Sequence, residues 1–363
     1  MKICLLTPFH ASWTKQEISI LNELGHTVFL LYNTAPHEDK NAKRFPIVTG
    51  LYENTKTFLK SIPTCLRSDL IYCWFVFPTG VFGTILGKFF KKKVILNAVG
   101  CDVVYIPSIN YGDPAKWYFR LFISWALRNA SKVIGESKES ARWARVWGAK
   151  HVTVVYEGIN TEKFKPSYIR ETKEKKEYVL LTVSALVKGI VERKGLITLL
   201  KALPRVADKF PDVKLVIIGK KGDAYPRLRQ IVKDLRIQDK VVFKGVVSNS
   251  KLVDFYNQCD IFVLPSLHEG FPTVCAEAQA CEKPVISTNT ASMPEVIKNH
   301  ETGLLVRAED VEELANAIMK LLSDPKLRKQ FGKAGRERVI HSFSKEIRQK
   351  NLQEMLATLK LKD

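Results

Sequence analysis

The sequence has few cysteines, and it lacks the patterns in which cysteines bind zinc or form a disulfide framework. None of its seven cysteines belongs to a Cys-x-x-Cys pair, and most lie inside apolar runs. Thiols in that setting are typical of buried positions in a reducing compartment. We therefore expect neither a zinc site nor structural disulfide bonds.

Low-complexity tracts and short-period repeats are also lacking, and we expect no secretion signal at the N-terminus. Residues Met1–Phe9 hold one lysine and a very short apolar stretch, which predicts a first strand. Apolar residues make up 46% of the 363, which is enough to build sizeable cores and excludes bulk disorder. A chain of this length suits two domains.

Acidic residues are in short supply relative to basic ones. The chain has 57 lysines and arginines against 37 aspartates and glutamates, a net charge of +20. Divided at residue 165, the first part has 22 basic and 12 acidic residues and the second has 35 and 25, so each carries +10. The excess is therefore spread along the chain. It favours polyanionic partners, such as nucleotide phosphates, anionic lipid headgroups or nucleic acid.

One long stretch lacks charged residues. Leu70–Gly87 contains eighteen uncharged residues and is followed by the lysine-rich segment Lys88–Lys93, a pattern that membrane spans also have. The stretch also contains Pro78 and three glycines, which favour a buried strand at Leu70–Phe77, a turn, and a helix with a close-packed small-residue face. We expect strand, turn and helix, because strands alternate with helices on both sides.

Short apolar strands alternate with helical patterns along the whole chain, which predicts an α/β fold with parallel sheets covered on both faces. The alternation breaks at Glu157–Glu177, as in an interdomain linker. Two doubly wound domains are therefore expected, with a ligand cleft between them at the carboxyl ends of the strands. We set an N-terminal domain at residues 1–165, a C-terminal domain at residues 166–343, and a C-terminal amphipathic helix at residues 344–363.

One segment combines a buried strand, a glycine-containing loop, the start of a helix and two carboxylates. It reads Pro265-Ser-Leu-His-Glu-Gly-Phe-Pro-Thr-Val-Cys-Ala-Glu277, with Pro272 where a helix would begin. Free backbone N–H groups and the positive dipole end of a helix suit a diphosphate. Glu269 and Glu277 can face one ligand, and carboxylates accept hydrogen bonds from sugar hydroxyls. The alternative is an ordinary capped helix with two surface glutamates.

The ordered motifs of the second half resemble the retaining glycosyltransferases of the GT-B fold known as glycosyltransferase family 4. Glu269 and Glu277 match the EX7E motif of that family. Other similar segments are Tyr156–Phe164, Arg193–Gly195, Phe243–Val247, Ala280–Thr288, Met293–Ile297, Glu301–Val306 and Asp324–Arg328. The match covers nearly the whole second half closely and the first half loosely. EX7E alone is a weak signal, whereas the ordered set is specific.

The resemblance implies two Rossmann-like domains that face a central cleft, with a C-terminal helix that returns to the first domain. It implies that Glu277 holds the ribose hydroxyls of a nucleotide, that Glu269 contacts hydroxyls of the donor sugar, and that Lys194 neutralises the departing phosphate. The further donor contacts that it implies are Gly270, Phe271, Pro272, Thr273, Val274, Arg193 and Val246.

The activity that the resemblance implies is retaining transfer of a hexose-type sugar from a nucleotide-diphosphate sugar, with UDP or GDP, to a glycan or lipid-linked acceptor. Cell-surface polysaccharide biosynthesis is a typical setting. No cofactor and no metal are expected. The sequence has no Asp-x-Asp metal-binding pair, in agreement with a leaving group that is stabilised by a cation and a helix end.

The acceptor side departs from the family pattern. Val99-Gly100 replaces the family's His-Gly pair, and His10-Ala-Ser-Trp13 occupies the place of its double-glycine loop. His10, Trp13 and Asp102 are our candidates there, with Asp102 as a catalytic residue. Their alternatives are a turn residue, core packing and a helix cap, and loss of the family histidine leaves inactivity as a further alternative.

The family also has an arginine shortly before its lysine. Here Ser184-Ala185 stands at that place, so Lys188 or Arg193 is expected to replace the missing arginine.

Aromatic and basic residues mix at Lys88–Lys93 and Tyr118–Trp147. Such a surface suits an anionic membrane and a lipid-linked acceptor, and the alternative is a solvated face with buried aromatics. We expect a cytoplasmic protein, with a peripheral position on the inner face of the cytoplasmic membrane as a variant of that expectation. Nucleic acid is not expected as a partner, because no known module or concentrated basic stripe is present.

Three other kinds of protein share part of this pattern. They are a nucleotide-sugar epimerase or phosphorylase on the same fold, a non-enzymatic polyanion- or membrane-binding protein, and a glycosidase that uses Glu269 and Glu277 as its two carboxylates. A glycosidase mechanism gives no role to the adjacent helix start or to Lys194.

Overall fold

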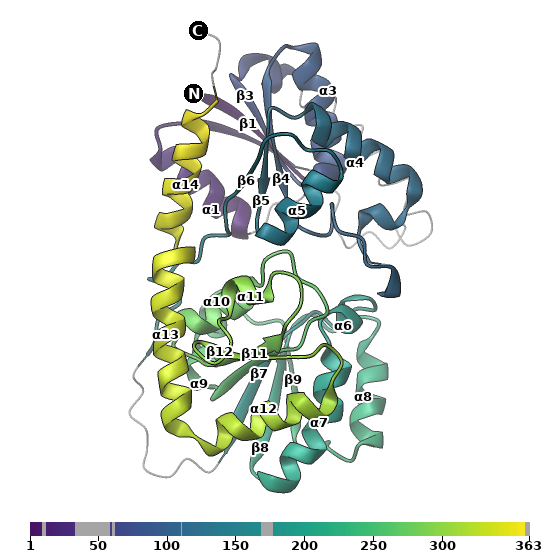
Figure 1. Ribbon diagram of the computed structural model, residues 1–363, viewed down its shortest axis with the longest axis vertical. Coiled ribbons are helices and arrows are strands. Elements are labelled where there is room, and N and C mark those ends of the chain that lie inside the picture. The colour runs from purple at the N-terminus through teal and green to yellow at the C-terminus, as the bar shows by residue number, and fades with distance from the viewer. Residues whose placement is uncertain (9–11, 33–58, 60–61, 110, 168–176, 360–363) are drawn as a thin grey trace. The chain divides into compact units, whose positions relative to one another are not determined.

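The computed structural model describes residues 1–8, 12–32, 59, 62–109, 111–167 and 177–359, which form two compact units (Figure 1). The first unit comprises Met1–Tyr156 together with Arg348–Asp363, and the second comprises Glu157–Ile347. The division falls between Tyr156 and Glu157, earlier than the boundary that we set at residue 165. The C-terminal segment belongs to the first unit, as the family resemblance implied.

The first unit is built on a six-stranded parallel sheet with the strand order β2-β1-β3-β4-β5-β6. Its strands are β1 Lys2–Thr7, β2 Thr27–Tyr32, β3 Leu70–Trp74, β4 Lys93–Ala98, β5 Lys132–Gly135 and β6 Val152–Val154. Its helices are α1 Ser12–Glu23, α3 Val81–Phe89, α4 Trp117–Asn129 and α5 Lys138–Val146, with short turns η1 Val76–Gly80, η2 Pro107–Ile109 and η3 Asp113–Ala115.

The charge-free stretch is a strand, a turn and a helix, as expected. β3 is buried, η1 follows it, and α3 packs so closely that a Cβ on Gly83 would lie 2.2 Å from the Cys73 sulfur and one on Gly87 would lie 2.1 Å from Val94 Cγ2. The membrane-span alternative was wrong. In the described part of the chain, every helix is too short or too polar to traverse a bilayer.

The second unit has its own six-stranded parallel sheet, with the order β12-β11-β10-β7-β8-β9. Its strands are β7 Tyr178–Val183, β8 Val213–Ile218, β9 Val241–Gly245, β10 Ile261–Leu264, β11 Val285–Thr288 and β12 Gly303–Val306. Its helices are α6 Ile190–Arg193, α7 Leu196–Lys209, α8 Tyr225–Asp234, α9 Asn249–Gln258, α10 Thr273–Ala280, α11 Met293–Val296, α12 Val311–Ser323 and α13 Pro325–Phe343. Most of the segment Arg170–Glu177 lies outside the described residues.

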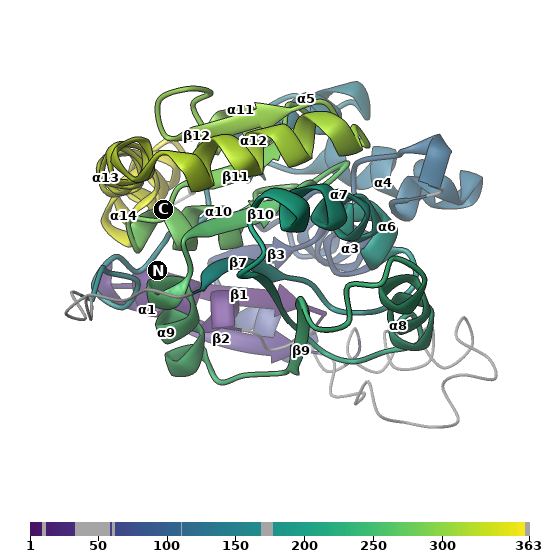
Figure 2. The same cartoon turned by 90° about the horizontal axis from the view of Figure 1, so that it is seen from below.

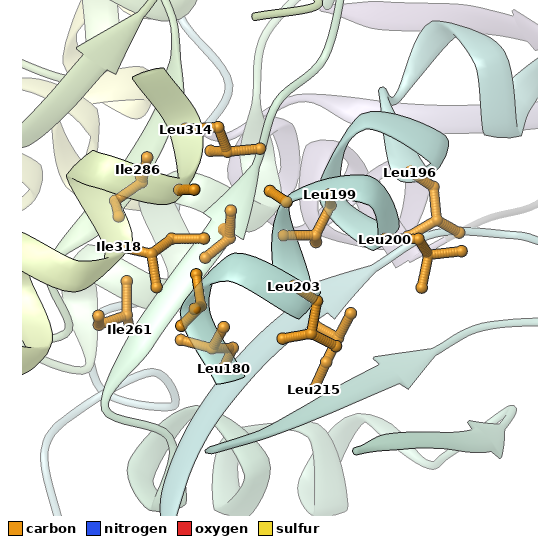
Figure 3. Close-up of a cluster of buried hydrophobic side chains, with 14 of the residues drawn as sticks. Leu180, Leu196, Leu199, Leu200, Leu203, Leu215, Ile261, Ile286, Leu314 and Ile318 are labelled. Atoms are coloured by element: carbon orange, nitrogen blue, oxygen red, sulfur yellow. The ribbon is translucent and has the colours of Figure 1, made fainter. Parts of the chain in front are cut away.

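A leucine- and isoleucine-rich core holds the second unit together. Figure 3 shows Leu199 and Leu203 of α7 and Ile318 of α12 gathered over buried side chains of the strands. Figure 2 shows α7 and α12 from a second side. Because these residues recur every three to four positions, each helix buries one stripe against the sheet. The rigid sheet then fixes the loops at its strand ends.

The C-terminal helix α14, Lys345–Ala357, ends before the expected residue 363. From Arg348 onward it is part of the first unit, where Leu352 and Met355 join a core cluster with Leu5 and Tyr72. Arg348 also bonds Glu17 of α1 there. These contacts explain why the end of the chain returns to its beginning.

All seven cysteines are free thiols, and six of them are buried, with Cys101 partly exposed. Cys4 and Cys65 lie close together, with 3.3 Å between their sulfur atoms. The expectation of buried thiols is therefore met by the described structure, apart from Cys101.

Candidate functional site

The predicted donor residues gather where strands β7 and β10 of the second unit end. The loop after β7 leads through α6 to Arg193 and Lys194, and the loop after β10 carries Glu269. The two loops are joined directly, because the Leu267 amide donates to the Arg193 carbonyl at 2.7 Å. A positive charge and a carboxylate therefore meet although they lie about seventy-five residues apart in the sequence.

Gly195 is the residue that allows this close approach. Its backbone is left-handed, with φ +64°, and a Cβ built on it would lie 1.9 Å from the Pro265 carbonyl oxygen. A side chain at this position would meet both a steric clash and a strained φ. Glycine therefore lets α7 begin directly against the end of β10, which keeps Lys194 beside the Glu269 loop.

Glu269 is held in one place by three neighbours. Its carboxylate forms an ion pair with Arg193 at 2.8 Å, lies 3.9 Å from the Lys194 ammonium, and accepts a hydrogen bond from Ser266 Oγ at 3.0 Å. Burial by itself would raise the pKa of Glu269, but Arg193 and Lys194 outweigh it and hold the pKa below its ordinary value. Glu269 is thus a charged, oriented acceptor at neutral pH.

Glu277 lies within α10 and has a different environment. The hydroxyl of the fully buried Tyr256 donates to its carboxylate at 2.8 Å. Burial raises the pKa of Glu277 to about 7, although Tyr256, Lys163 and Lys194 all act to lower it. The two glutamates of the EX7E spacing therefore differ in their charge near neutral pH.

Lys194 connects the two carboxylates electrostatically. Its ammonium donates to the Val183 carbonyl at 3.1 Å, which fixes it at the end of β7. It lies 3.9 Å from the Glu269 carboxylate, and its charge also acts to lower the pKa of Glu277. The site therefore combines two cations, Arg193 and Lys194, with the carboxyl groups of the EX7E spacing, and this arrangement can serve a ligand that has both phosphate and hydroxyl groups.

The segment between the glutamates offers backbone groups more than side chains. Phe271 is buried, with its ring 5.5 Å from that of Phe343, and Pro272 is buried too. Gly270, Thr273 and Val274 are half-buried. Because α10 begins at Thr273, its first N–H groups and its dipole lie beside this loop.

Arg193 and Lys188 occupy different settings. The Arg193 guanidinium bonds both the Glu269 carboxylate and the His268 carbonyl, the latter at 2.7 Å, so it positions the loop. Lys188 is exposed, and its backbone amide bonds Asp223. The structure therefore places Arg193, and not Lys188, beside Lys194 and Glu269. Val246 is exposed just after β9, free of core packing.

Asp102, predicted as a catalytic residue of the acceptor side, lies in a buried, hydrogen-bonded position. It is fully buried, and its carboxylate accepts hydrogen bonds from the backbone amides of Val76, Val99 and Gly100 at 2.7 to 3.0 Å. Burial raises its pKa to about 6, against the effect of these donors. Asp102 therefore fastens the loop after β3 to the loop after β4, close to the cap role that we gave as its alternative.

Trp13 packs against aromatic residues of the first unit, and its ring stacks on Trp74 with 4.3 Å between centroids. Core packing, the alternative for Trp13, is therefore what the structure shows. His10 lies outside the described residues. Val99 is half-buried and donates its amide to Asp102, so it belongs to the fastened loop.

Two site residues were not predicted from the sequence. Tyr256 reaches Glu277 from α9, and Ser266 orients Glu269. Nothing in the sequence around Tyr256, which lies among polar residues of a helix, indicates this role. Ser266 could have been predicted, because it lies three residues before Glu269. Among the residues that the structure describes, no group of three or more His, Cys, Asp or Glu side chains is placed to hold a metal ion.

Comparisons with known proteins point to the same part of the chain. Residues 165–338 match the family model described as glycosyl transferases group 1. A Staphylococcus aureus protein named capsular polysaccharide biosynthesis glycosyltransferase CapM is 35% identical over 204 residues, which cover 55% of this chain and 53% of that protein. A GDP-mannose-dependent alpha-(1-6)-phosphatidylinositol monomannoside mannosyltransferase of Mycobacterium tuberculosis is 32% identical over 208 residues, 54% of each protein. The chain thus matches about half the length of these curated relatives.

The fold matches over nearly the whole chain. Sucrose-phosphate synthase from Thermosynechococcus elongatus superposes with a TM-score of 0.81 and covers 98% of both chains, at 21% sequence identity. At that identity the similarity shows the fold alone, which is that of two parallel α/β sheets in tandem.

Proposed function

Because residues 165–338 belong to the glycosyl transferases group 1, in a chain with the GT-B fold, we propose that this protein transfers a sugar from a nucleotide-diphosphate sugar to an acceptor. One observation carries the proposal. Arg193 and Lys194 lie 2.8 and 3.9 Å from the carboxylate of Glu269, so two cations and the first carboxylate of the EX7E spacing form one cluster in the loop before α10.

Each group has a role that its chemistry supports. Glu277 accepts hydrogen bonds from the ribose hydroxyls, and Glu269, charged and held by Arg193 and Ser266, accepts them from the donor sugar. In the segment from Gly270 to Val274, the backbone N–H groups of Gly270, Phe271 and Val274 meet the sugar and the diphosphate, since Pro272 has no N–H and that of Thr273 donates to the Phe271 carbonyl. Val246, exposed after β9, is proposed to contact the base.

Charge development explains why a cation is needed. As the bond between the sugar and the diphosphate breaks, the leaving nucleotide diphosphate gains negative charge. Lys194 and the positive end of α10 stabilise that charge, because they are already in place before the reaction. Arg193 acts through Glu269 and is a positioning residue. Removal of one such preorganised group from an active site typically costs on the order of 10²-fold or more in rate.

Finer features of the reaction are part of the same proposal. The sugar is of the hexose type, the anomeric configuration is retained, and no metal or cofactor takes part. The donor is a UDP- or GDP-sugar, and the name of the GDP-mannose-dependent relative favours the GDP form. The acceptor is a glycan or a lipid-linked acceptor. The name of the capsular polysaccharide relative supports a glycan, and the name of the phosphatidylinositol monomannoside mannosyltransferase supports a lipid-linked acceptor. The reaction takes place on the cytoplasmic side of the membrane.

The experiment that tests the proposal measures binding and nucleotide release with a panel of UDP-, GDP- and ADP-sugars. We expect one donor to bind and Glu277→Ala to abolish its binding. Glu354→Ala, an exposed glutamate of α14, is the matched control and should bind as the wild type does. An absence of binding to every nucleotide sugar would refute the proposal. Conversion of the donor with no acceptor present would indicate an epimerase, and a requirement for free phosphate would indicate a phosphorylase.

A further inference from the structure

Two helices of the first unit expose large apolar side chains. These are Ile85 and Phe89 on α3 and Trp117, Leu121 and Phe122 on α4, with 41% to 78% of each exposed. Within each helix the spacing of four residues places Ile85 with Phe89, and Trp117 with Leu121, on one stripe. Since apolar side chains of this size are normally exposed singly, two such stripes on two helices indicate a binding surface.

The two helices are neighbours within the first unit. Figures 1 and 2 show α3 and α4 side by side from two directions. The Lys88 ammonium of α3 lies 5.5 Å from the centroid of the Trp125 ring of α4, so the side chains of the helices meet. We call the exposed side chains of Ile85, Phe89, Trp117, Leu121 and Phe122, with the basic residues beside them, the α3–α4 surface.

The charge of this surface has a single sign. Residues 81–98 and 114–129 contain seven basic residues and no aspartate or glutamate. The basic residues are Lys88, Lys91, Lys92, Lys93, Lys116, Arg120 and Arg128. Most of them are exposed, and Lys92 and Arg120 are half-buried. The surface therefore combines exposed aromatic rings with a net positive field, with Asp113, one residue before the second segment, interacting with Lys116.

We propose that the α3–α4 surface lies on an anionic lipid bilayer. A bilayer suits both features at once, because aromatic rings enter the headgroup region while lysines and arginines contact anionic lipids. A protein partner fits less well, since lysine is depleted in the centre of protein interfaces. With 13 residues, α4 is about 20 Å long, which is shorter than the roughly 30 Å hydrocarbon core of a bilayer. It would therefore lie in the plane of the membrane surface.

The binding surface stands on its own observations. Its use, which is to hold the enzyme where a lipid-linked acceptor is found, rests on the proposed function. All residues of the α3–α4 surface belong to the first unit, whereas Lys194, Glu269 and Glu277 belong to the second. Membrane binding and donor binding are therefore separable by mutation.

The test is cosedimentation of the full chain with vesicles of phosphatidylcholine alone or with about a third phosphatidylglycerol. We expect binding to the anionic vesicles and little to the neutral ones. Phe89→Gln with Trp117→Gln and Phe122→Gln should weaken binding at least tenfold. Lys91→Gln with Lys93→Gln should weaken it by roughly tenfold or more, since each lysine near an anionic surface changes the binding constant about fivefold.

Matched controls come from α13 of the second unit. Ile340→Gln removes an exposed apolar side chain, and Lys326→Gln with Lys329→Gln removes two exposed charges, with no expected change in vesicle binding. Trp117→Phe should bind as the wild type does but lose part of the fluorescence quenching by brominated lipids. That variant reports ring insertion without a loss of apolar surface, so a folding defect does not imitate the result.

Two outcomes would overturn the inference. One is equal binding to neutral and anionic vesicles, or binding to neither. The other is a triple apolar variant that changes the oligomeric state in gel filtration while vesicle binding is absent, which would make the α3–α4 surface a protein interface. A failure of the proposed function can be distinguished from a failure of this inference. Glu277→Ala should still bind vesicles, and the triple apolar variant should still bind the nucleotide sugar.

Discussion

Glu277 is a carboxyl group whose charge changes near neutral pH. Its burial raises the pKa to about 7 from an ordinary value of 4.5. Between these values the folded protein retains a proton that the unfolded chain has released. The stability that this group contributes is therefore fully present below pH 4.5 and is lost as the pH rises through about 7.

We predict that the free energy of unfolding of the wild type falls more steeply with pH in this window than that of Glu277→Gln. Urea denaturation at a series of pH values, from below 4.5 to above 7, measures both slopes. Asp102 and Asp113 also have raised pKa values, of about 6 and about 7, and add a slope of the same sign to both proteins. Only the difference between the two proteins reports Glu277, and parallel curves would contradict the raised pKa.

Residues of the site were predictable where the chain itself places them together. Glu269, Gly270 and Glu277 lie in one strand-loop-helix segment, so their spacing was visible in the sequence. Tyr256 was not predictable, because it reaches Glu277 from another helix. The setting of Asp102 was not predictable for the same reason, since one of its three donors, Val76, follows a different strand. Side-chain environments of this kind depend on the tertiary fold.

At the scale of elements, the ion pair between α14 and α1 carries a testable consequence. Arg348 and Glu17 are almost fully buried, with contacts of 2.8 and 3.2 Å, and Tyr72 donates to Glu17 at 2.6 Å. Arg348 also donates to the Tyr156 carbonyl at 2.7 Å. This network joins the end of the chain to the first sheet and the first helix.

We predict that Arg348→Met lowers the free energy of unfolding by about 3–5 kcal/mol, because it leaves the Glu17 carboxylate buried without its cation. The double variant Arg348→Met with Glu17→Gln should lose less than the sum of the two single variants. Urea denaturation of the four proteins completes the double-mutant cycle. Additive losses would show that the pair is not coupled and that α14 is held by its apolar contacts.

Element boundaries followed the sequence where local signals mark them. α10 begins at Thr273, directly after Pro272, where a helix start was expected. β3 was predicted to reach Phe77 but ends at Trp74. Phe75 has a positive φ of 69°, and the amide of Val76 bonds Asp102. A tertiary contact therefore ends this strand although its apolar run continues.

At the scale of the whole molecule, the alternation of strands and helices predicted two tandem sheets, but not where one unit ends. Residues after Tyr156 belong to the second unit because the Ile159 amide donates to the Phe343 carbonyl at 2.7 Å and the ring of Phe164 meets that of Tyr256. The two residues of each contact are 184 and 92 positions apart in the sequence, so no local sequence pattern predicts these contacts.

The two units differ in how the chain builds them, and this difference leads to a last prediction. The second unit is one continuous segment, Glu157–Ile347, which holds its own core and all of Lys194, Tyr256, Glu269 and Glu277. The first unit needs two separate segments, the second of which supplies Arg348, Leu352 and Met355. We therefore predict that a fragment of residues 157–347 folds alone and binds the nucleotide sugar.

A chain that ends at residue 347 should behave in the opposite way. It keeps the second unit whole but removes Arg348 from Glu17 and the buried side chains of Leu352, Met355 and Leu356 from the first core. Its first unit should unfold at lower urea concentration than in the full chain, while nucleotide-sugar binding persists. Denaturation followed by tryptophan fluorescence measures this, because all six tryptophans lie before residue 148 and report the first unit alone. If the fragment of residues 157–347 instead fails to fold, the donor site depends on the first unit, and the two sheets act as one cooperative body.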